Sequence, residues 1–186
     1  LVHHVAPVFE KLKLPATVFL TTGFIEAGIK GDSRPLEIFK HRLACHAKPL
    51  TWQEVGNLAE MGFEIGAHTI SHRNLTELPF HTLEKEVASC KEEIEYHVAS
   101  RVRYFAYPFG HLLSFNEQVK RVVANARYEA AFTAVRGNIL DFADPLELPR
   151  NDMKVAWPSD LVDMYLQGRF EKILYKLYLW RLRFNL

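Results

Sequence analysis

Short apolar runs alternate with amphipathic helical patterns, and this alternation is the strongest constraint on the fold. Four apolar runs have the length and composition of buried strands: residues 17–20, 63–67, 102–107 and 128–134. Helical patterns precede or separate them at residues 5–12, 51–62, 82–98 and 116–126. Strands joined by helices form a parallel sheet with the helices packed outside it. The order of elements therefore predicts an α/β protein.

Local signals give several of these boundaries. Thr51 and Glu54 have the spacing of a capping box, and Gly62 is placed to end the helix that they begin. Asn116 is expected to cap the helix that ends near Ala126. Residues 145–150 predict a further short strand or strand edge. Residues 28–50 are expected to be irregular, with a short helix near residues 36–43.

Size and composition are those of a single globular domain. The 186 residues are 48% hydrophobic and 24% charged. A net charge of +1 provides no general attraction for nucleic acid, so no such partner is expected. Cys45 and Cys90 lie in different contexts and are expected to be free thiols. No apolar run approaches the roughly 18–20 residues of a membrane span.

Two histidines stand four residues apart directly after one of the predicted strands. A spacing of four puts both rings of His68 and His72 on one side of a helical turn, and also on one face of an extended segment. Imidazole nitrogens suit zinc and its neighbours among the divalent metals. We therefore expect this pair to bind a divalent ion, with zinc favoured. The Thr69 hydroxyl would orient one ring. The alternative is a pair of ordinary surface or core histidines.

A second motif follows another predicted strand. The apolar run at residues 102–107 stops at Pro108-Phe109-Gly110, a sequence typical of a fixed turn. In α/β barrels the chemistry lies at the carboxyl ends of the strands. His68 and Pro108 both fall at such ends. The alternative reading of the second motif is a turn without function.

Together the two motifs resemble the polysaccharide deacetylase family, carbohydrate esterase family four. That family has a His-(Ser/Thr)-x-x-His metal motif and a later strand that ends in (Arg or Ala)-x-Pro-(Tyr/Phe)-Gly. The resemblance extends from about residue 5 to about residue 168, with further matching segments at residues 14–20, 50–55, 61–66 and 125–133. It implies a distorted (β/α) barrel. It also implies metal-dependent hydrolysis of N-acetyl groups on acetamido-sugar polysaccharides or oligosaccharides.

The resemblance also assigns roles to the turn. The backbone N–H of Phe109 would hold the oxyanion of a tetrahedral intermediate, and Pro108 and Gly110 would fix the turn and border the substrate. The Phe109 ring would line the sugar pocket. Many family members carry arginine where this sequence has Ala106, and that arginine orients the catalytic base. We expect Arg150 to replace it from another strand.

Each remaining candidate has a simpler reading. Arg150 could instead form a surface ion pair with Asp152 or Glu147. The family's later motif for a general acid has no clear match. His111 follows the turn and Asp152 follows Arg150, but neither occupies a motif position, so both are expected to be bystanders.

One family motif has no counterpart in the sequence. The family opens with a strand that ends in a Phe-Asp-Asp-Gly type motif, in which one aspartate is the general base and the other is the third metal ligand. The 186 residues contain no Asp-Asp pair, and residue 1 already lies in the region that resembles the following helix. We therefore expect the first strand to be missing. We also expect the chain as given to be inactive, because it lacks a base and one ligand.

The C-terminal segment differs in composition from the rest. Residues 169–186 carry five basic residues and one acidic residue among several aromatic side chains. We therefore divide the chain into a deacetylase-like domain, residues 1–168, and a basic aromatic helix or tail, residues 169–186. The tail would pack on the barrel or touch a membrane surface or protein partner. Two alternatives to an enzyme stay open: a non-catalytic carbohydrate-binding or scaffold domain, and an interaction module that uses the tail.

Overall fold

The computed structural model describes residues 2, 5–32, 48–139, 141–153 and 157–167. The chain divides into two compact units, Leu1–Arg150 and Asn151–Leu186. The first unit contains the sheet, and the second contains helix α7 (Ser159–Leu166). The short helix expected near residues 36–43 and the tail at residues 169–186 both lie outside the described residues. The domain boundary at residue 168 stays a prediction.

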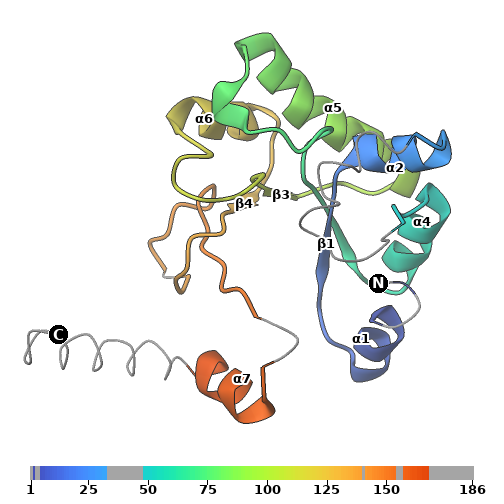
Figure 1. The fold of residues 1–186 in the computed structure, drawn as a ribbon, viewed down its shortest axis with the longest axis vertical. Helices are drawn as coiled ribbons and strands as arrows, with labels where there is room; N and C mark the ends of the chain where they lie inside the picture. Colours follow the sequence, from blue (N-terminus) through green and yellow to red (C-terminus); the bar gives the residue numbers. More distant parts are fainter. Residues whose placement is uncertain (1, 3–4, 33–47, 140, 154–156, 168–186) are drawn as a thin grey trace, which may run out of the picture. The chain divides into compact units, whose positions relative to one another are not determined.

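The first unit is built on a parallel sheet. Its strands stand side by side in chain order: β1 (Thr17–Leu20), β2 (Glu64–Ala67), β3 (Tyr104–Ala106) and β4 (Ala130–Phe132) (Figure 1). Phe132 also forms a parallel bridge to Leu148, which confirms the strand edge expected at residues 145–150. The predicted α/β class is thus confirmed, whereas the closure of the sheet into a barrel stays a prediction.

Helices connect these strands, and most begin or end at the predicted signals. They are α1 (Ala6–Leu12), α2 (Thr22–Ile29), α4 (Trp52–Glu60), the 3₁₀ turn η1 (Leu75–Glu77), α5 (Phe80–Val98) and α6 (Glu117–Asn125). The capping box of Thr51 and Glu54 is formed in both directions, and the Asn116 side chain accepts from the N–H of Val119. Helix α2 was not predicted, because two glycines in eight residues weaken its helical signal.

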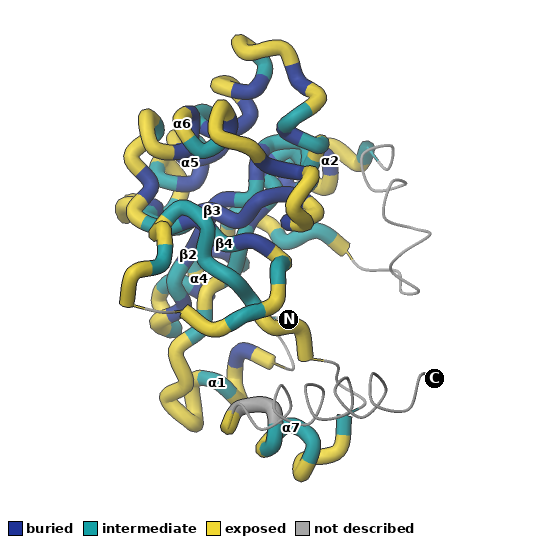
Figure 2. Tube along the Cα trace, turned by 90° about the vertical axis from the view of Figure 1, so that its left-hand side faces the viewer, coloured by how far each residue is buried: buried dark blue, intermediate teal, exposed yellow. Residues whose placement is uncertain are grey.

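The core lies between one face of the sheet and the helices. On that face the strands present Leu20, Ile65, Ala67, Phe105 and Ala131, all buried (Figure 2). Helix α5 contacts β2 and covers them with the predicted apolar stripe of Leu83, Val87, Cys90 and Ile94. The helix-covered face of the sheet thus forms the hydrophobic core of this unit.

The other face of the sheet carries aromatic side chains. The ring of Phe132 lies 5.7 Å from that of Phe19 and 5.9 Å from that of Tyr104. The strand between them has Gly66, where an added Cβ would lie 2.6 Å from the Phe19 ring. A glycine is therefore required for this aromatic layer to close over β2.

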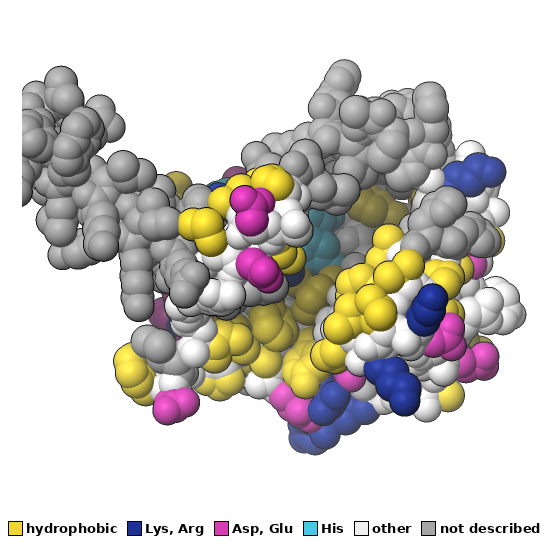
Figure 3. Space-filling model, turned by 90° about the horizontal axis from the view of Figure 1, so that it is seen from below, with side chains coloured by type: hydrophobic (Ala, Val, Ile, Leu, Met, Phe, Trp, Pro, Cys, Tyr) yellow, Lys and Arg dark blue, Asp and Glu magenta, His cyan; other side chains and the backbone are white. Residues whose placement is uncertain are grey.

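Charged side chains of both signs lie on the surface of the described residues (Figure 3). In the right-hand part of Figure 3, Lys and Arg side chains lie next to Asp and Glu side chains. None of the helices in the described ranges combines the length and the apolar character needed to span a bilayer.

Candidate metal centre

The two predicted metal ligands come together just beyond the carboxyl end of β2. The N–H of His68 donates to the Leu20 carbonyl at 2.8 Å, which continues the pairing of β1 with β2 by one residue. The ring centroids of His68 and His72 are 4.6 Å apart, with the ring planes at 83°. The structure therefore brings together the two side chains that the spacing singled out.

The backbone that brings them together is neither helical nor extended, so that part of the prediction was wrong. Thr69 has φ of 67° and His72 has φ of 55°. The left-handed region is rarely occupied by a β-branched residue, and such backbone persists only where its surroundings hold it. The Thr69 hydroxyl accepts from the backbone N–H of His72 at 2.9 Å. Thr69 thus acts on the backbone that carries the second ring.

The carbonyl side of this loop rests on the start of α2. The N–H of Thr22 donates to the Thr69 carbonyl at 3.3 Å, and that of Gly23 donates to the Ile70 carbonyl at 2.9 Å. These are N–H groups of a first helical turn, which have no partner within the helix. A Cβ at Gly23 would lie 2.4 Å from the Ile70 oxygen, so the approach requires glycine. The carbonyl groups of the loop therefore accept hydrogen bonds from the N–H groups at the start of the helix, so both sets of polar groups have partners.

The N–H side of the loop is held by Glu86, a residue that the sequence analysis did not identify. Its carboxylate accepts from the N–H of Ile70 at 3.0 Å, from the N–H of Ser71 at 2.9 Å and from the Ser71 hydroxyl. Only 6% of Glu86 is exposed. A signal did exist, because Glu86 lies three residues after Leu83 and four before Cys90, on the apolar stripe of α5.

The ring of His68 is fixed in one tautomer. Its Nδ1 lies 2.7 Å from the Ala106 carbonyl at the end of β3, and a carbonyl can only accept. The proton is therefore on Nδ1, and Nε2 carries the lone pair. Burial lowers the pKa of His68 to about 4, although the hydrogen bond to Ala106 acts in the opposite direction. A neutral ring with a set tautomer is the form that binds metal.

The Pro108-Phe109-Gly110 turn lies beside the histidines. The N–H of Gly110 donates to the Pro108 carbonyl at 2.7 Å, and Phe109 has φ of 63°, the signature of a tight γ-turn. The N–H of Ala134 donates to the Gly110 carbonyl at 2.8 Å, which ties the turn to the segment after β4. The Phe109 ring lies 5.1 Å from that of His72.

A pocket opens next to His72. It has a volume of about 450 Å³ and is lined by residues 71–74, 77 and 78 and by Phe109 and His111. Phe109 is 38% exposed, so part of its ring faces this space. The lining thus combines the aromatic ring of Phe109 with several polar side chains.

Arg150 reaches the same end of the sheet. Its Nε donates to the Thr133 carbonyl at 2.7 Å, and its guanidinium carbon lies 5.6 Å from the centre of the Phe19 ring. Its charge contributes to the lowered pKa of His68. Glu147, one of the two ion-pair partners considered for Arg150, pairs instead with Lys120 at 3.0 Å. Whether Arg150 acts on a catalytic base stays a prediction.

The two imidazoles of His68 and His72 are the candidate metal donors that the structure brings together. Among the described residues, no three or more His, Cys, Asp and Glu side chains are grouped so that they could hold a metal ion. The neutral ring of His68 and its neighbour His72 fit two positions of a divalent ion. The remaining positions would have to be filled by water or by groups outside this set.

The structure defines an α/β domain with a parallel sheet, in which two histidines meet at the end of a strand. The chain belongs to the polysaccharide deacetylase family, whose sequence model matches residues 1–131. Comparison with curated protein sequences gives no match.

Solved structures confirm the fold. A deacetylase from Streptococcus pyogenes, PplD in complex with acetate, superposes with a TM-score of 0.68 at 20% identity. The polysaccharide deacetylase BC0361 from Bacillus cereus gives 0.59 at 22% identity. BA3943 from Bacillus anthracis, described as a pseudoenzyme of carbohydrate esterase family four, gives 0.51 at 18% identity.

In each of these three comparisons, the matched region is a larger share of this chain than of the other chain. The matches include 85%, 77% and 70% of this chain, respectively, and 62%, 40% and 37% of the other chains. This chain therefore spans less than two thirds of the length of each.

Proposed function

We propose that this chain provides two metal ligands and the oxyanion-binding turn of a metal-dependent deacetylase. The reaction would be hydrolysis of N-acetyl groups on acetamido-sugar polysaccharides or oligosaccharides. The observation that carries the proposal is the contact of the His68 and His72 rings, 4.6 Å apart, at the carboxyl end of a parallel strand. Membership of the polysaccharide deacetylase family supports the reaction class.

His68 and His72 would hold a divalent cation, and zinc is the metal that we expect. When bound, such an ion would polarise the acetyl carbonyl and lower the pKa of a coordinated water. The contribution of this chain would be to set the protonation state and the orientation of the donor ring. Burial keeps His68 neutral down to about pH 4, and its hydrogen bond to Ala106 directs Nε2 away from that carbonyl.

The turn would act on the tetrahedral intermediate. Attack of water on the acetyl carbon places negative charge on the former carbonyl oxygen, and the N–H of Phe109 would donate to it. Pro108 and Gly110 hold this N–H in a turn that is closed by a 2.7 Å hydrogen bond, so little reorganisation accompanies the reaction. The Phe109 ring and the adjoining pocket would bind the sugar that carries the acetyl group.

The reaction also needs a group that accepts a proton from the attacking water, and the family's motif for this base does not occur in the 186 residues. The family places it in an Asp-Asp pair, and the 186 residues have none. Arg150 is proposed to orient that base in place of the family's arginine. We predict that the 186-residue polypeptide on its own releases no acetate.

A second candidate function is carbohydrate binding without catalysis. The presence of Ala106, where many family members carry the arginine that orients the base, favours it, while the pocket beside His72 would still accept a sugar. The fold is also compatible with it, since the pseudoenzyme from Bacillus anthracis is among the similar structures.

Two measurements test these proposals. Calorimetric titration with zinc should show one site that is lost in His68→Ala and in His72→Ala. It should remain in His81→Ala, which removes an exposed histidine from α5. Equal zinc affinity in the wild type and in all three variants would refute the assignment of His68 and His72 as metal ligands.

Acetate release from chitin oligomers separates the enzyme from the binding domain. The 186-residue chain should be inactive, and a chain extended at its N-terminus by a segment with the Asp-Asp motif should be active. Sugar binding by an extended chain that never turns over would favour the second candidate. Turnover by the 186-residue chain that is abolished in His72→Ala would show that another group serves as the base.

A further inference from the structure

We propose that Glu86 is a positioning residue of the metal centre, whose buried carboxylate fixes the loop between the two histidines and thereby the direction of His72. This inference rests on the proposed function. Glu86 touches neither metal nor substrate in this scheme, and it would act through the backbone of Ile70 and Ser71.

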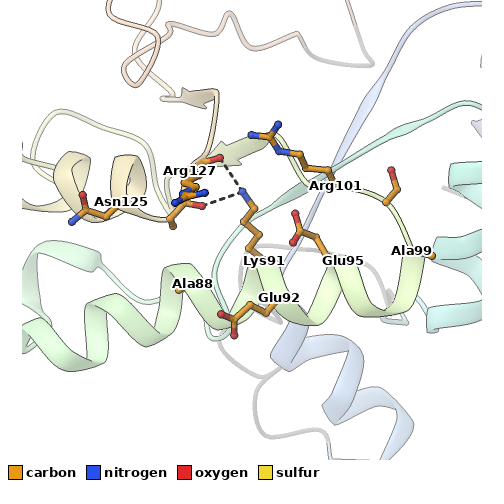
Figure 4. Close-up of a pocket in the computed structure, with 10 residues that line it drawn as sticks. Ala88, Lys91, Glu92, Glu95, Ala99, Arg101, Asn125 and Arg127 are labelled. Atoms are coloured by element: carbon orange, nitrogen blue, oxygen red, sulfur yellow. Dashed lines mark hydrogen bonds between the residues drawn. The ribbon is translucent and has the colours of Figure 1, made fainter.

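Helix α5 carries two buried charges, and they serve opposite ends of the sheet. Glu86 is 6% exposed and Lys91 is 8% exposed. Such residues are almost never this deeply buried unless their charges are satisfied. The Lys91 ammonium donates to the Ala126 and Arg127 carbonyls at 3.0 and 2.9 Å, where α6 ends and β4 is about to begin (Figure 4). Glu86 instead meets the loop that follows the carboxyl end of β2.

The burial of the Lys91 ammonium group is thus explained by its contribution to the stability of the fold alone. A cation at the carbonyl end of a helix compensates the helix dipole and the last unpaired carbonyls. That end of a parallel sheet is also the one where α/β barrels place stability rather than chemistry. Glu86 lies at the other end, and its three hydrogen bonds all go to residues between His68 and His72.

The two histidines depend on Glu86 to different degrees. His68 is anchored by its backbone bond to Leu20 and by its ring bond to Ala106, neither of which involves Glu86. His72 follows directly after Ser71, and its own backbone is in the left-handed region at φ of 55°. Without Glu86, the N–H groups of Ile70 and Ser71 lose their acceptors. The loop would then be free to relax, and His72 would turn away from His68.

Three variants of Glu86 separate position from charge. Glu86→Leu removes all three acceptor contacts. Glu86→Asp keeps the charge but withdraws it by one methylene. Glu86→Gln keeps one oxygen that can accept from both backbone N–H groups, and its amide NH₂ can donate to the Ser71 hydroxyl. Lys91→Met is the matched control, since it removes a buried charge from the same helix at the opposite end of the sheet.

The test is zinc affinity of the 186-residue chain at a temperature at which circular dichroism shows each variant folded. Changes in groups that orient metal ligands typically cost about 10–100-fold in affinity, and we expect that loss for Glu86→Leu. Glu86→Asp should lose several-fold, and Glu86→Gln should stay close to wild type. Lys91→Met should melt at a lower temperature but bind zinc as the wild type does. Folded Glu86→Leu or Glu86→Asp that binds as tightly as Lys91→Met would overturn the proposal.

Ring signals in nuclear magnetic resonance spectra of the metal-free protein give a second readout. Glu86→Leu or Glu86→Asp should shift the imidazole resonances of His72 and leave those of His68 in place. Unchanged His72 resonances in a folded variant would refute the positioning role. If zinc binding is indifferent to His68→Ala and His72→Ala, the proposed function fails, and the ring resonances still decide whether Glu86 holds the loop.

Discussion

Two glycine-to-alanine substitutions in neighbouring helices should change stability in opposite directions. Gly56 lies within α4, where an added Cβ meets nothing within 4 Å. Alanine there should stabilise the protein by about 0.5–1 kcal/mol, because glycine costs that much in a helix interior. Gly23 lies in the first turn of α2, where the same methyl group would lie 2.4 Å from the Ile70 carbonyl oxygen.

The magnitude at Gly23 follows from what must move. Real Cβ atoms essentially never come within 3.0 Å of such an atom, so the loop and the helix must separate by at least 0.6 Å, the difference between 3.0 and 2.4 Å. The 2.9 Å hydrogen bond from the Gly23 N–H to the Ile70 carbonyl would then weaken or break. Losing it costs about 1–3 kcal/mol if the carbonyl stays buried, against a helix gain of about 0.5–1 kcal/mol.

Urea unfolding followed by circular dichroism measures both variants against wild type. We expect Gly23→Ala to lower the free energy of unfolding by up to about 2.5 kcal/mol, the cost of the lost hydrogen bond less the helix gain, with an unchanged denaturant slope. Gly56→Ala should raise it. Because the displaced loop carries His72, Gly23→Ala should also weaken zinc binding, whereas Gly56→Ala should not. A Gly23→Ala protein as stable as Gly56→Ala would refute the close contact between α2 and the loop that joins His68 to His72.

Three further predictions concern Lys120, Tyr107 and Cys90. Lys120→Met should lower the free energy of unfolding by about 1–3 kcal/mol, because Lys120 is 14% exposed and pairs with Asp144 at 2.8 Å and Glu147 at 3.0 Å. Arg101→Met is the control, since it breaks an exposed ion pair. It should lower the free energy of unfolding by less than about 1 kcal/mol in the same urea assay. Tyr107→Phe should cost about 1 kcal/mol by removing the 2.8 Å hydrogen bond from its hydroxyl to the Leu146 carbonyl. Burial raises the pKa of the Cys90 thiol from its ordinary value of 9.0 to about 12. Wild type should therefore lose stability relative to Cys90→Ala by about 1.4 kcal/mol per unit as pH rises above about 9.

Each of these has a result that would contradict it. Equal effects of Lys120→Met and Arg101→Met would mean that the ion pairs of Lys120 contribute no more than a single exposed pair. A Tyr107→Phe protein with wild-type stability would mean that its hydrogen bond to Leu146 is offset by water in the unfolded chain. The sign for Cys90 follows from proton counts: between about pH 9 and 12 the unfolded thiol has lost its proton and the folded one keeps it. A stability difference between wild type and Cys90→Ala that does not change with pH would place the thiol in contact with solvent.

Local signals allowed the elements to be predicted. The capping box at Thr51 and Glu54, the cap at Asn116 and the stripe on α5 depend on neighbouring residues alone, and the structure forms all of them. The four strands followed from short apolar runs. Helix α2 was missed because its glycines lower the helical propensity, and one of them is needed for contact with a loop 47 positions away in sequence.

The candidate site was only partly predictable, because its support comes from distant parts of the chain. The spacing of His68 and His72 placed both rings correctly at a strand end, but it gave the wrong backbone conformation. The left-handed residues are stabilised by α2 and by Glu86, and no local pattern specifies either contact. The bond from His68 to the Ala106 carbonyl depends on the pairing of β2 with β3. Such contacts between strand ends become visible only once the sheet is assembled.

X-ray absorption at the zinc edge of the loaded 186-residue chain would show whether His68 and His72 bind zinc. Imidazole ligands give characteristic outer-shell scattering, with zinc–nitrogen distances of about 2.0–2.1 Å. The account predicts two imidazoles per zinc in the wild type and one in the His72→Ala variant, with oxygen donors filling the remaining positions. A spectrum without imidazole scattering, or one that is the same in wild type and in His72→Ala, would contradict it.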